Sequence, residues 1–346
     1  MAASIKPILA VTMGDPAGIG AEVIIGAWGD PRIHEQVRPL GVGHPEILRR
    51  AARLLNRDIN VVEIEPLTLL KGLAADPKTV PCIKVCSDEV LDVPAGRVDA
   101  RAGEAAFRAI ELAATLAREK KVGGIVTAPL SKAALQAAGH QYPGHTELLA
   151  EMCGVADFAM MLYLPAGEAV RSPNGLGVVH VTLHQSLRSV FADLTPEAVV
   201  AKCRLADAAM RRLGAQRPRL AVCALNPHAG EDGLFGDEER TIIVPAVEHA
   251  LREGLDVSGP NPTDTLMVRA RDGEFDAVVA MYHDQGHIAL KLLGIHAAVN
   301  ITLGLPIVRT SVAHGTAFDR AWQGTACCEG MVAAIVTAAR LIQQRA

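Results

Sequence analysis

The chain has 346 residues, half of them apolar and only 3% aromatic, with a formal net charge of −4. This length suffices for about two domains with a large aliphatic core, and the scattered lysines and arginines exclude the electrostatic footprint of a nucleic-acid-binding protein. The apolar runs fall short of the roughly 18–20 residues of a membrane span, and the N-terminus is unlike a signal peptide, so we expect a cytoplasmic protein. The seven cysteines form no CxxC pair and are predicted to be reduced.

Short β-branched runs alternate with segments of helical periodicity along the chain. The runs are PILAVTM, GGIVTAP, GLGVVHVTLH, RLAVCALNPH, FDAVVAMYH and AAVNITLG. The clearest helix covers about residues 102–121, and a second helix begins at Pro196 with Thr195 as its N-cap. This alternation predicts an α/β fold in which helices cover both faces of a parallel sheet.

The first predicted strand leads into a glycine-rich loop, MGDPAGIGAE, that opens a helix. The loop matches neither the dinucleotide-binding pattern GxGxxG nor the phosphate-binding pattern GxxxxGK[ST]. A purely structural tight turn and a cradle for an anion therefore both remain open for residues 13–22.

Several predicted strands end on polar residues, and ligands of open α/β sheets bind beyond the carboxyl ends of the strands. Three histidines arrive at this edge from separate strands: His184, His228 and His283. They are placed to converge on one metal ion, because neutral imidazole is a common metal ligand. Taken singly, each is better explained as a hydrogen-bonded structural residue, and only the three together make a metal site an equal alternative. Their neighbours His180 and His287 are interpreted as structural.

Two further stretches carry groups suited to ligands. In GHTE, a helix start brings backbone N–H groups together with His145 and Thr146, which suits a phosphate or carboxylate; the alternative is that Thr146 merely caps the helix. The stretch AHGTAFDRAWQGTA, residues 313–326, by itself indicates only a loop before a C-terminal helix.

Eight motifs occur in order between residues 13 and 317: MGDPAGIG, GHTE, VTLH, LNPHAGE, DTL, YHDQG, VNITLGLPIVRTS and HGTA. Together they resemble the 4-hydroxythreonine-4-phosphate dehydrogenase family, which belongs to the wider isocitrate/isopropylmalate dehydrogenase-like fold. The resemblance covers nearly the whole chain. It implies two α/β/α domains with the active site in the interdomain cleft, and a homodimer in which the neighbouring subunit completes each site. We place the first domain at residues 1–125 plus 290–346 and the second at 126–289.

The resemblance also implies roles for individual residues. The family's divalent-metal ligands match His184, His228 and His283, with Zn, Co, Mn, Ni or Mg as the metal. The contacts to the substrate's phosphate and carboxylate carry over to His145, Thr146, Lys291, Asn300 and Arg309. The segment that is similar to the family's loop for NAD or NADP comprises His314, Gly315, Thr316 and Asp319.

The implied reaction belongs to pyridoxine biosynthesis. It is the metal-dependent, NAD(P)-linked oxidation of the 3-hydroxyl of 4-hydroxy-L-threonine 4-phosphate, followed by decarboxylation of the β-keto acid. Our candidates for the base, or for a group that orients the ligand histidines, are Asp264 and Asp284. Lys291 is the third predicted catalytic residue and supplies local positive charge for the anionic substrate. The alternative, purely structural roles are an N-cap for Asp264 and a turn residue for Asp284.

The sequence differs from the vitamin B6 members of the family at several positions, so more than one substrate remains possible. Those members have Pro in place of Ala21, Asp in place of Ala313, and no histidine at the position of His287. YHDQGHI and GLFGDEE resemble a branch that performs the same chemistry on D-threonate or D-erythronate 4-phosphate and gives dihydroxyacetone phosphate. A dihydrodiol dicarboxylate dehydrogenase and a non-catalytic sugar-phosphate binding protein are the remaining alternatives.

Overall fold

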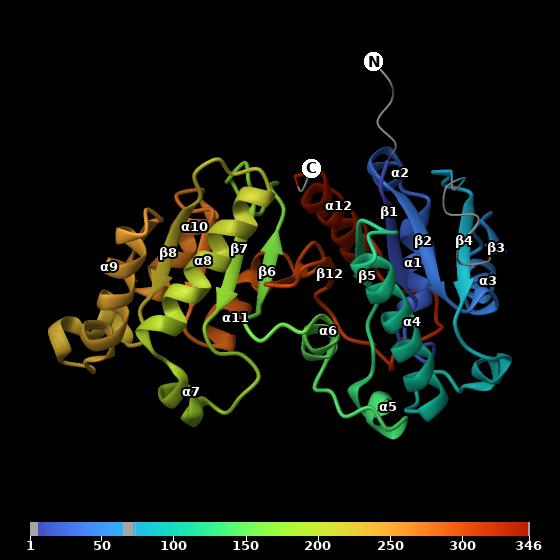
Figure 1. The fold of residues 1–346 in the computed structure, drawn as a ribbon, viewed down its shortest axis with the longest axis horizontal. Helices are drawn as coiled ribbons and strands as arrows, with labels where there is room; N and C mark the ends of the chain where they lie inside the picture. Colours follow the sequence, from blue (N-terminus) through green and yellow to red (C-terminus); the bar gives the residue numbers. More distant parts are fainter. Residues whose placement is uncertain (1–5, 65–71, 73, 345–346) are drawn as a thin grey trace, which may run out of the picture. The chain divides into compact units, whose positions relative to one another are not determined.

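The protein is described by a computed structural model that covers residues 6–64, 72 and 74–344 (Figure 1). The chain forms two compact units, the first up to Ala156 together with Leu305–Gln344 and the second Asp157–Gly304. Alternating helices and strands confirm the predicted α/β class. The units differ from the predicted domains in two segments, since residues 126–156 lie in the first unit and residues 290–304 in the second.

The described sheet of the first unit has the strand order β3-β4-β2-β1-β5-β12. All of its pairs are parallel. The bounds are β1 Ile8–Thr12, β2 Arg38–Gly43, β3 Asn60–Glu63, β4 Thr79–Lys84, β5 Gly124–Thr127 and β12 Val308–Val312. The register pairs Thr127 with both Thr12 and Ser311, so three hydroxyls form one row at the carboxyl end of the central strands.

Helices pack on this sheet as the alternation predicted. α4 (Ala100–Arg118) and α12 (Glu329–Gln343) both contact β1 and β5, whose residues are buried at every position. Because successive strand residues point to opposite faces, complete burial means that both faces are covered. α4 confirms the helix predicted at 102–121. The other helices are α1 Gly20–Trp28, α2 Pro31–Gln36, α3 Pro45–Leu54, η2 Asp88–Asp92, α5 Lys132–Ala137 and α6 His145–Cys153.

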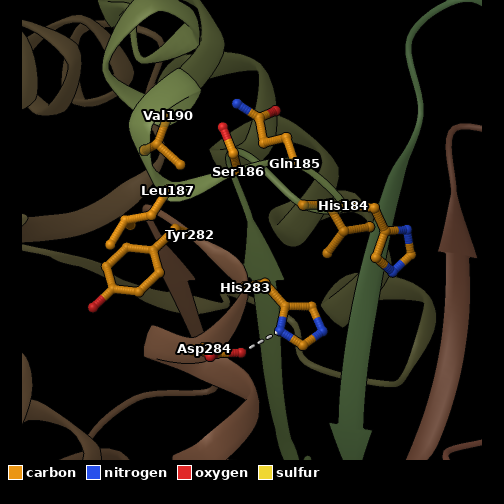
Figure 2. A pocket seen from close by; sticks show the side chains of 9 residues that line it. His184, Gln185, Ser186, Leu187, Val190, Tyr282, His283 and Asp284 are labelled. Atoms are coloured by element: carbon orange, nitrogen blue, oxygen red, sulfur yellow. Dashed lines mark hydrogen bonds and ion pairs between the residues drawn. The ribbon is translucent and has the colours of Figure 1, made fainter.

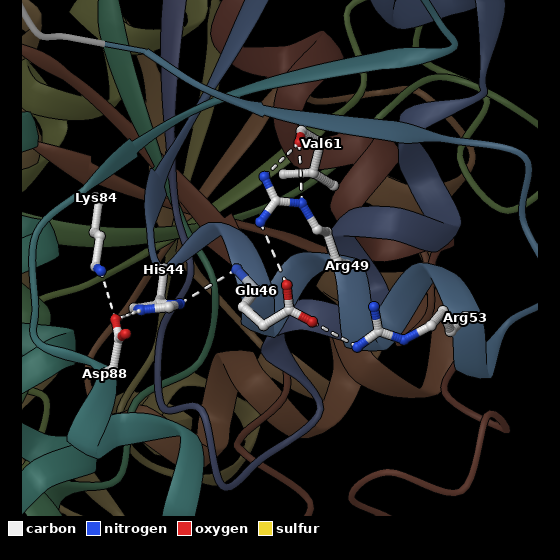
Figure 3. Close-up of polar contacts among 7 residues, drawn as sticks. All are labelled: His44, Glu46, Arg49, Arg53, Val61, Lys84 and Asp88. Carbon is white, nitrogen blue, oxygen red and sulfur yellow. Dashed lines mark hydrogen bonds and ion pairs between the residues drawn. The ribbon is translucent and has the colours of Figure 1, made fainter.

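The amino-terminal end of α3 shows how such a helix is fixed locally (Figure 3). The ring Nδ1 of His44 accepts the Glu46 N–H at 3.2 Å, and Pro45 fills the first helical position. The Glu46 carboxylate then pairs with Arg49 and Arg53 along the exposed face. Such surface pairs contribute only a few tenths of a kcal/mol each, roughly, so the apolar face decides where the helix lies.

The described sheet of the second unit has the order β11-β6-β7-β10-β8-β9. The bounds are β6 Ala159–Leu164, β7 Leu176–His180, β8 Arg219–Cys223, β9 Asp256–Asn261, β10 Ala277–Ala280 and β11 Val299–Leu303. The prediction of a parallel sheet is wrong for β6, which runs antiparallel to both β7 and β11. The chain passes from β6 to β7 without the crossover helix that a parallel pair requires.

The helices of the second unit place the loops that carry the histidines. α8 (Pro196–Arg212) and α11 (His283–Gly294) both pack on β7 and β10. The Thr195 hydroxyl accepts the Ala198 N–H at 3.2 Å, which confirms the predicted N-cap. The other helices are α7 Leu187–Asp193, η3 Pro227–Gly233, η4 Glu239–Ile243, α9 Val244–Arg252 and α10 Thr263–Arg271.

Within the described ranges no helix is both long and apolar enough to cross a membrane. All seven cysteines are free thiols, as predicted.

A buried carboxylate joins β8 and the segment before β7 to the start of β10 in the second unit. Asp276, next to β10, is almost fully covered and accepts the Arg219 backbone N–H at 2.9 Å and the Ser172 hydroxyl at 2.8 Å. The Arg219 guanidinium and the Asn174 amide add further donors to the same carboxylate. Burial raises the pKa of Asp276, but these hydrogen bonds outweigh it, so the pKa lies below the ordinary value.

We expect Asp276→Asn to lower the free energy of unfolding by about 2 kcal/mol at pH 7, because it removes the charge that the buried donors face. A depressed folded-state pKa stabilises the fold above the ordinary carboxyl pKa of 3.8, and this contribution is lost as pH falls through the folded value. The difference between wild type and variant should therefore shrink below about pH 4 in urea denaturation. Asp272→Asn, at an exposed pair, is the control and should change little. If the difference in unfolding free energy between wild type and Asp276→Asn did not change with pH, a depressed folded-state pKa of Asp276 would be contradicted.

Candidate active site

The three predicted strand-end histidines lie in the segments that follow their strands. β7 already ends at His180 and β8 at Cys223, so both histidines lie beyond the sheet, His184 in a loop and His228 in the turn η3. His283 is the first residue of α11, which begins shortly after β10. The row of polar residues in YHDQGH is thus the first turn of a helix at the carboxyl edge of the sheet.

A pocket of about 580 Å³ opens at this edge of the second unit (Figure 2). The ring centroids of His184 and His283 lie 5.9 Å apart in its wall. The Nδ1–H of His283 donates to Oδ1 of Asp284 at 2.6 Å, which fixes the ring and leaves Nε2 as its second nitrogen. The lining residues are Leu183, His184, Gln185, Ser186, Leu187, Val190, Tyr282, His283 and Asp284.

Two histidines interpreted as structural from the sequence stand directly behind His283. The ring of His287 stacks on that of His283 at 3.9 Å, and its Nδ1 lies 3.0 Å from Nε2 of His180. Burial, with the neighbouring imidazoles, lowers the pKa of His180 to about 4 and that of His287 to about 2, so both rings are neutral at pH 7. The spacing of four residues between His283 and His287 on one helix was the signal for this contact.

His228 does not join the other two predicted metal ligands. Its ring lies 6.4 Å from that of Phe235. Across the part of the chain that the structure describes, no three His, Cys, Asp or Glu side chains are grouped to hold a metal ion. The described residues of one chain therefore bring together His184 and His283 but supply no complete ligand set, and the metal roles stay a prediction.

The turn that carries His228 has an unusual backbone. Residues 228–232 all have positive φ, and only Gly230 among them is a glycine. Left-handed conformation costs roughly 1–2 kcal/mol for each non-glycine residue, so the surroundings must hold the turn. The buried Glu239 does so at its base, where Oε1 accepts the N–H groups of Leu225 at 2.8 Å and Asn226 at 2.7 Å.

In the first unit, two predicted substrate ligands lie together beneath the end of β5. Arg309 is buried and donates from Nη2 to the Thr127 hydroxyl at 2.8 Å. Burial lowers the pKa of Arg309 to about 10, and burial together with Arg309 holds the pKa of His145 well below its usual range. A guanidinium beside a neutral imidazole suits a group with negative charge and hydroxyls.

Two further observations at His145 and Thr146 also suit a ligand with negative charge. Nε2 of His145 is buried and has no hydrogen-bond partner among the described residues. Thr146 is buried in the first turn of α6, but the N-cap is Gly144 and no side chain caps the helix. The interpretation of Thr146 as a mere cap is therefore wrong.

The other predicted substrate and catalytic residues lie in the second unit. Lys291 lies on α11 one turn beyond His287 and is half-buried. Asn300, on β11, has a buried Oδ1 without a partner in the described residues. Asp264 is exposed near the start of α10 and accepts the Thr265 N–H at 2.9 Å; the N-cap position is Pro262, so the alternative role as an N-cap is wrong.

The predicted cofactor residues form an irregular loop in the first unit. His314 Nδ1 lies 3.0 Å from the Gly315 carbonyl, and Gly315 and Asp319 are exposed. The Thr316 carbonyl accepts the Ile19 N–H at 3.1 Å, which ties this loop to the glycine-rich loop after β1.

The glycine-rich loop itself contains a buried carboxyl, Asp15. Burial raises the pKa of Asp15 to about 6, although the N–H groups of Ala17 and Ser131 act against this. A second acidic side chain, Asp99, adds to the rise. A buried carboxyl disfavours an anion nearby, so the loop is better explained as a structural turn than as an anion cradle.

Comparison with known proteins identifies the family of the chain. Residues 35–338 match the family described as "Pyridoxal phosphate biosynthetic protein PdxA". A D-threonate 4-phosphate dehydrogenase of Pectobacterium atrosepticum is 46% identical, with 96% of this chain and 99% of that protein covered. A 4-hydroxythreonine-4-phosphate dehydrogenase of Trichlorobacter lovleyi is 43% identical, with 98% and 99% covered.

A crystal structure of a 4-hydroxythreonine-4-phosphate dehydrogenase from Klebsiella pneumoniae superposes with a TM-score of 0.84 at 44% identity, covering 98% of this chain and all of that one. The family match spans most of the chain, and the relatives are named dehydrogenases. These findings confirm the resemblance in the sequence motifs: the chain belongs to the PdxA family of pyridoxal phosphate biosynthetic proteins and is a dehydrogenase of that type.

Proposed function

We propose that this chain oxidises the 3-hydroxyl of 4-hydroxy-L-threonine 4-phosphate with NAD or NADP and then releases carbon dioxide from the β-keto acid. One observation carries the proposal: a pocket wall formed by His184 and by His283, whose ring Asp284 orients, in a chain whose full-length relatives act on phosphorylated hydroxy acids by name. The seven free thiols and the nicotinamide cofactor suit the cytoplasm.

A second candidate is the same chemistry on D-threonate 4-phosphate. Its support is the Pectobacterium relative of that name, which is as similar to this chain as the 4-hydroxythreonine-4-phosphate dehydrogenases are. The two substrates differ only in an amine or a hydroxyl at carbon 2. D-erythronate 4-phosphate shares the hydroxyl and belongs with this candidate.

The substrate's anionic groups are assigned to cationic and neutral polar side chains. In the first unit the proposed ligands are Arg309, His145 and Thr146, because the buried guanidinium carries a positive charge and the buried Nε2 of His145 has no hydrogen-bond partner among the described residues. In the second unit they are Lys291 and Asn300, whose buried Oδ1 lacks a partner within the described residues.

The reaction has two steps. First the C3–H bond breaks as hydride passes to the nicotinamide ring, while the hydroxyl proton passes to a base, and a ketone forms. Then the bond to the carboxyl carbon breaks, carbon dioxide leaves, and the electron pair remains as an enolate that is later protonated. Asp264 is the proposed base, Lys291 supplies positive charge for the enolate oxygen, and Asp284 acts by orienting His283.

A divalent cation is part of the proposal. When bound, it would polarise the substrate's hydroxyl and keto oxygens. His184 and His283 are neighbours that fit two positions of such a site, whereas the described residues of one chain do not bring His228 to them. We therefore derive no step through the cation and propose that its site is completed only in a homodimer.

Exposed apolar side chains support a homodimer. They lie in the three segments that carry the predicted metal ligands, namely α7 after His184, the chain after η3 with His228, and α11 with His283. Leu292 is 82% exposed and Leu234 73% exposed. A monomer rarely leaves so many large apolar groups in water, so a second copy is the proposed cover. The residues are Leu187, Phe191, Leu234, Phe235, Ile288, Leu292 and Ile295.

Initial-rate assays with three substrates test the function. We expect the kcat/KM for 4-hydroxy-L-threonine 4-phosphate to exceed that for D-threonate and D-erythronate 4-phosphate by at least about tenfold, because a site built for one polar group rejects another. The assays follow NADH or NADPH formation with added divalent metal. A preference for a sugar acid would establish the second candidate, and no turnover of any of the three would contradict the proposed reaction.

His283→Ala tests the pocket. We expect kcat to fall by about 10²–10⁴-fold and the purified protein to lose bound metal, with circular dichroism unchanged, since the ring is only partly buried. Exposed His296→Ala is the matched control and should retain both properties. Metal content is measured by elemental analysis, and chelation of the wild type should abolish turnover until metal is returned. A His283→Ala protein that is active and metal-replete removes the assignment.

Leu292→Glu tests the dimer. A charge at the most exposed apolar position of α11 should shift the mass measured by light scattering from dimer to monomer, because a buried unpaired charge is costly at an interface. Activity should fall with it. Leu251→Glu, exposed on α9, is the control and should stay dimeric. A wild-type protein that is monomeric at all concentrations would contradict the shared site.

A further inference from the structure

Two stretches far apart in the chain are joined into one body in the first unit: the glycine-rich loop with the start of α1, and the loop at residues 313–324, here called the cofactor loop. The Ile19 N–H donates to the Thr316 carbonyl at 3.1 Å, and the indole N–H of Trp322 donates to the Pro16 carbonyl at 2.9 Å. Gly18 packs so closely that a Cβ there would lie 2.9 Å from the Thr316 oxygen. The two stretches therefore cannot move independently.

The cofactor loop has a backbone that must be held in place. Ala317 has φ 43° and Trp322 has φ 61°, both in the left-handed region that costs a non-glycine residue energy. Such conformations persist only where the surrounding structure determines them. A group elsewhere in the protein must therefore hold the loop in this conformation.

That group is the carboxylate of Glu22 in the first turn of α1. It is 1% exposed, and its two oxygens each accept one backbone N–H of the loop, Trp322 at 2.7 Å and Gly324 at 2.8 Å. A buried carboxylate is costly unless its oxygens are hydrogen-bonded, and the N-terminal turn of a helix favours its charge. The two hydrogen bonds to the Glu22 carboxylate form only when the loop has this shape.

We propose that Glu22 is a positioning residue for the nicotinamide cofactor, because its carboxylate holds the cofactor loop in the shape that receives NAD or NADP. The inference rests on the proposed function for its use of NAD or NADP, and on the sequence resemblance, which implies that the cofactor contacts His314, Gly315, Thr316 and Asp319. Glu22 acts through the loop, since it is itself buried. The motif MGDPAGIGAE then supports the cofactor site from beneath and does not bind a phosphate.

Glu22→Gln tests the inference with little change in volume. One oxygen becomes an amino group that faces a backbone N–H, so one of the two bonds is lost. We expect the Kd and the KM of NAD to rise by about tenfold, which corresponds to about 1.4 kcal/mol. The kcat at saturating NAD and the KM of the phosphorylated substrate should change by less than about twofold, a split that general destabilisation would not give.

The chain offers its own probe for this titration. It has only two tryptophans, and one of them, Trp322, lies in the cofactor loop. NAD binding is therefore followed by quenching of tryptophan fluorescence, and Trp322→Phe identifies the responding residue by loss of the signal. Glu239→Gln is the matched control, because it changes a buried carboxylate that also accepts two backbone N–H groups but lies in the second unit; its Kd for NAD should equal that of the wild type.

Glu22→Asp keeps the charge but shortens the reach, and it serves as the second variant if Glu22→Gln does not fold. We expect its affinity for NAD to be lowered as well. Wild-type affinity in a folded Glu22 variant would overturn the inference while leaving the proposed function intact. A wild-type protein that binds neither NAD nor NADP in the titration is a different result, which would refute the proposed function and the inference with it.

Discussion

The hydrogen bond from a backbone N–H to a buried carboxylate shapes the parts of this protein that lie outside its sheets. Glu22 holds the loop at residues 313–324, Glu239 holds the turn with His228, and Asp276 joins strands of the second unit. In each case a charge that would be costly in the interior is satisfied by backbone N–H donors, which belong to irregular segments for Glu22 and Glu239 and to the first residue of β8 for Asp276. Carboxylate and loop therefore stabilise one another, and neither arrangement is favourable alone.

This interaction complements the constraint set by the parallel strands. Their carboxyl ends meet at one edge of each sheet, so the segments that follow them bring polar groups to common places. His184 and His283 meet in this way after β7 and β10. Arg309 instead lies within β12 and reaches Thr127 at the end of β5, close to His145. The sheets bring the residues together, and the buried carboxylates fix the loops that present the remaining groups.

Patterns within a short stretch could be predicted from the sequence, and pairings across the chain could not. The helices α4 and α8 were predicted because periodicity and the Thr195 cap are local signals. The stack of His287 on His283 was available from helical spacing but was interpreted as structural. The hydrogen bonds of Glu22 and the direction of β6 could not be predicted. The partners of Glu22 follow some 300 residues later, and the antiparallel direction of β6 depends on its neighbouring strands. No local spacing encodes either fact.

The left-handed turn at residues 228–232 has a consequence for dynamics. Its strain is present only in the folded chain, so opening this segment releases energy that opening an ordinary loop would not. Local opening here therefore requires less free energy than the burial of Glu239 alone suggests, and backbone amides of the turn should exchange with solvent before those of the adjacent β8. The turn that carries His228 is thus the segment next to β8 that we expect to open first.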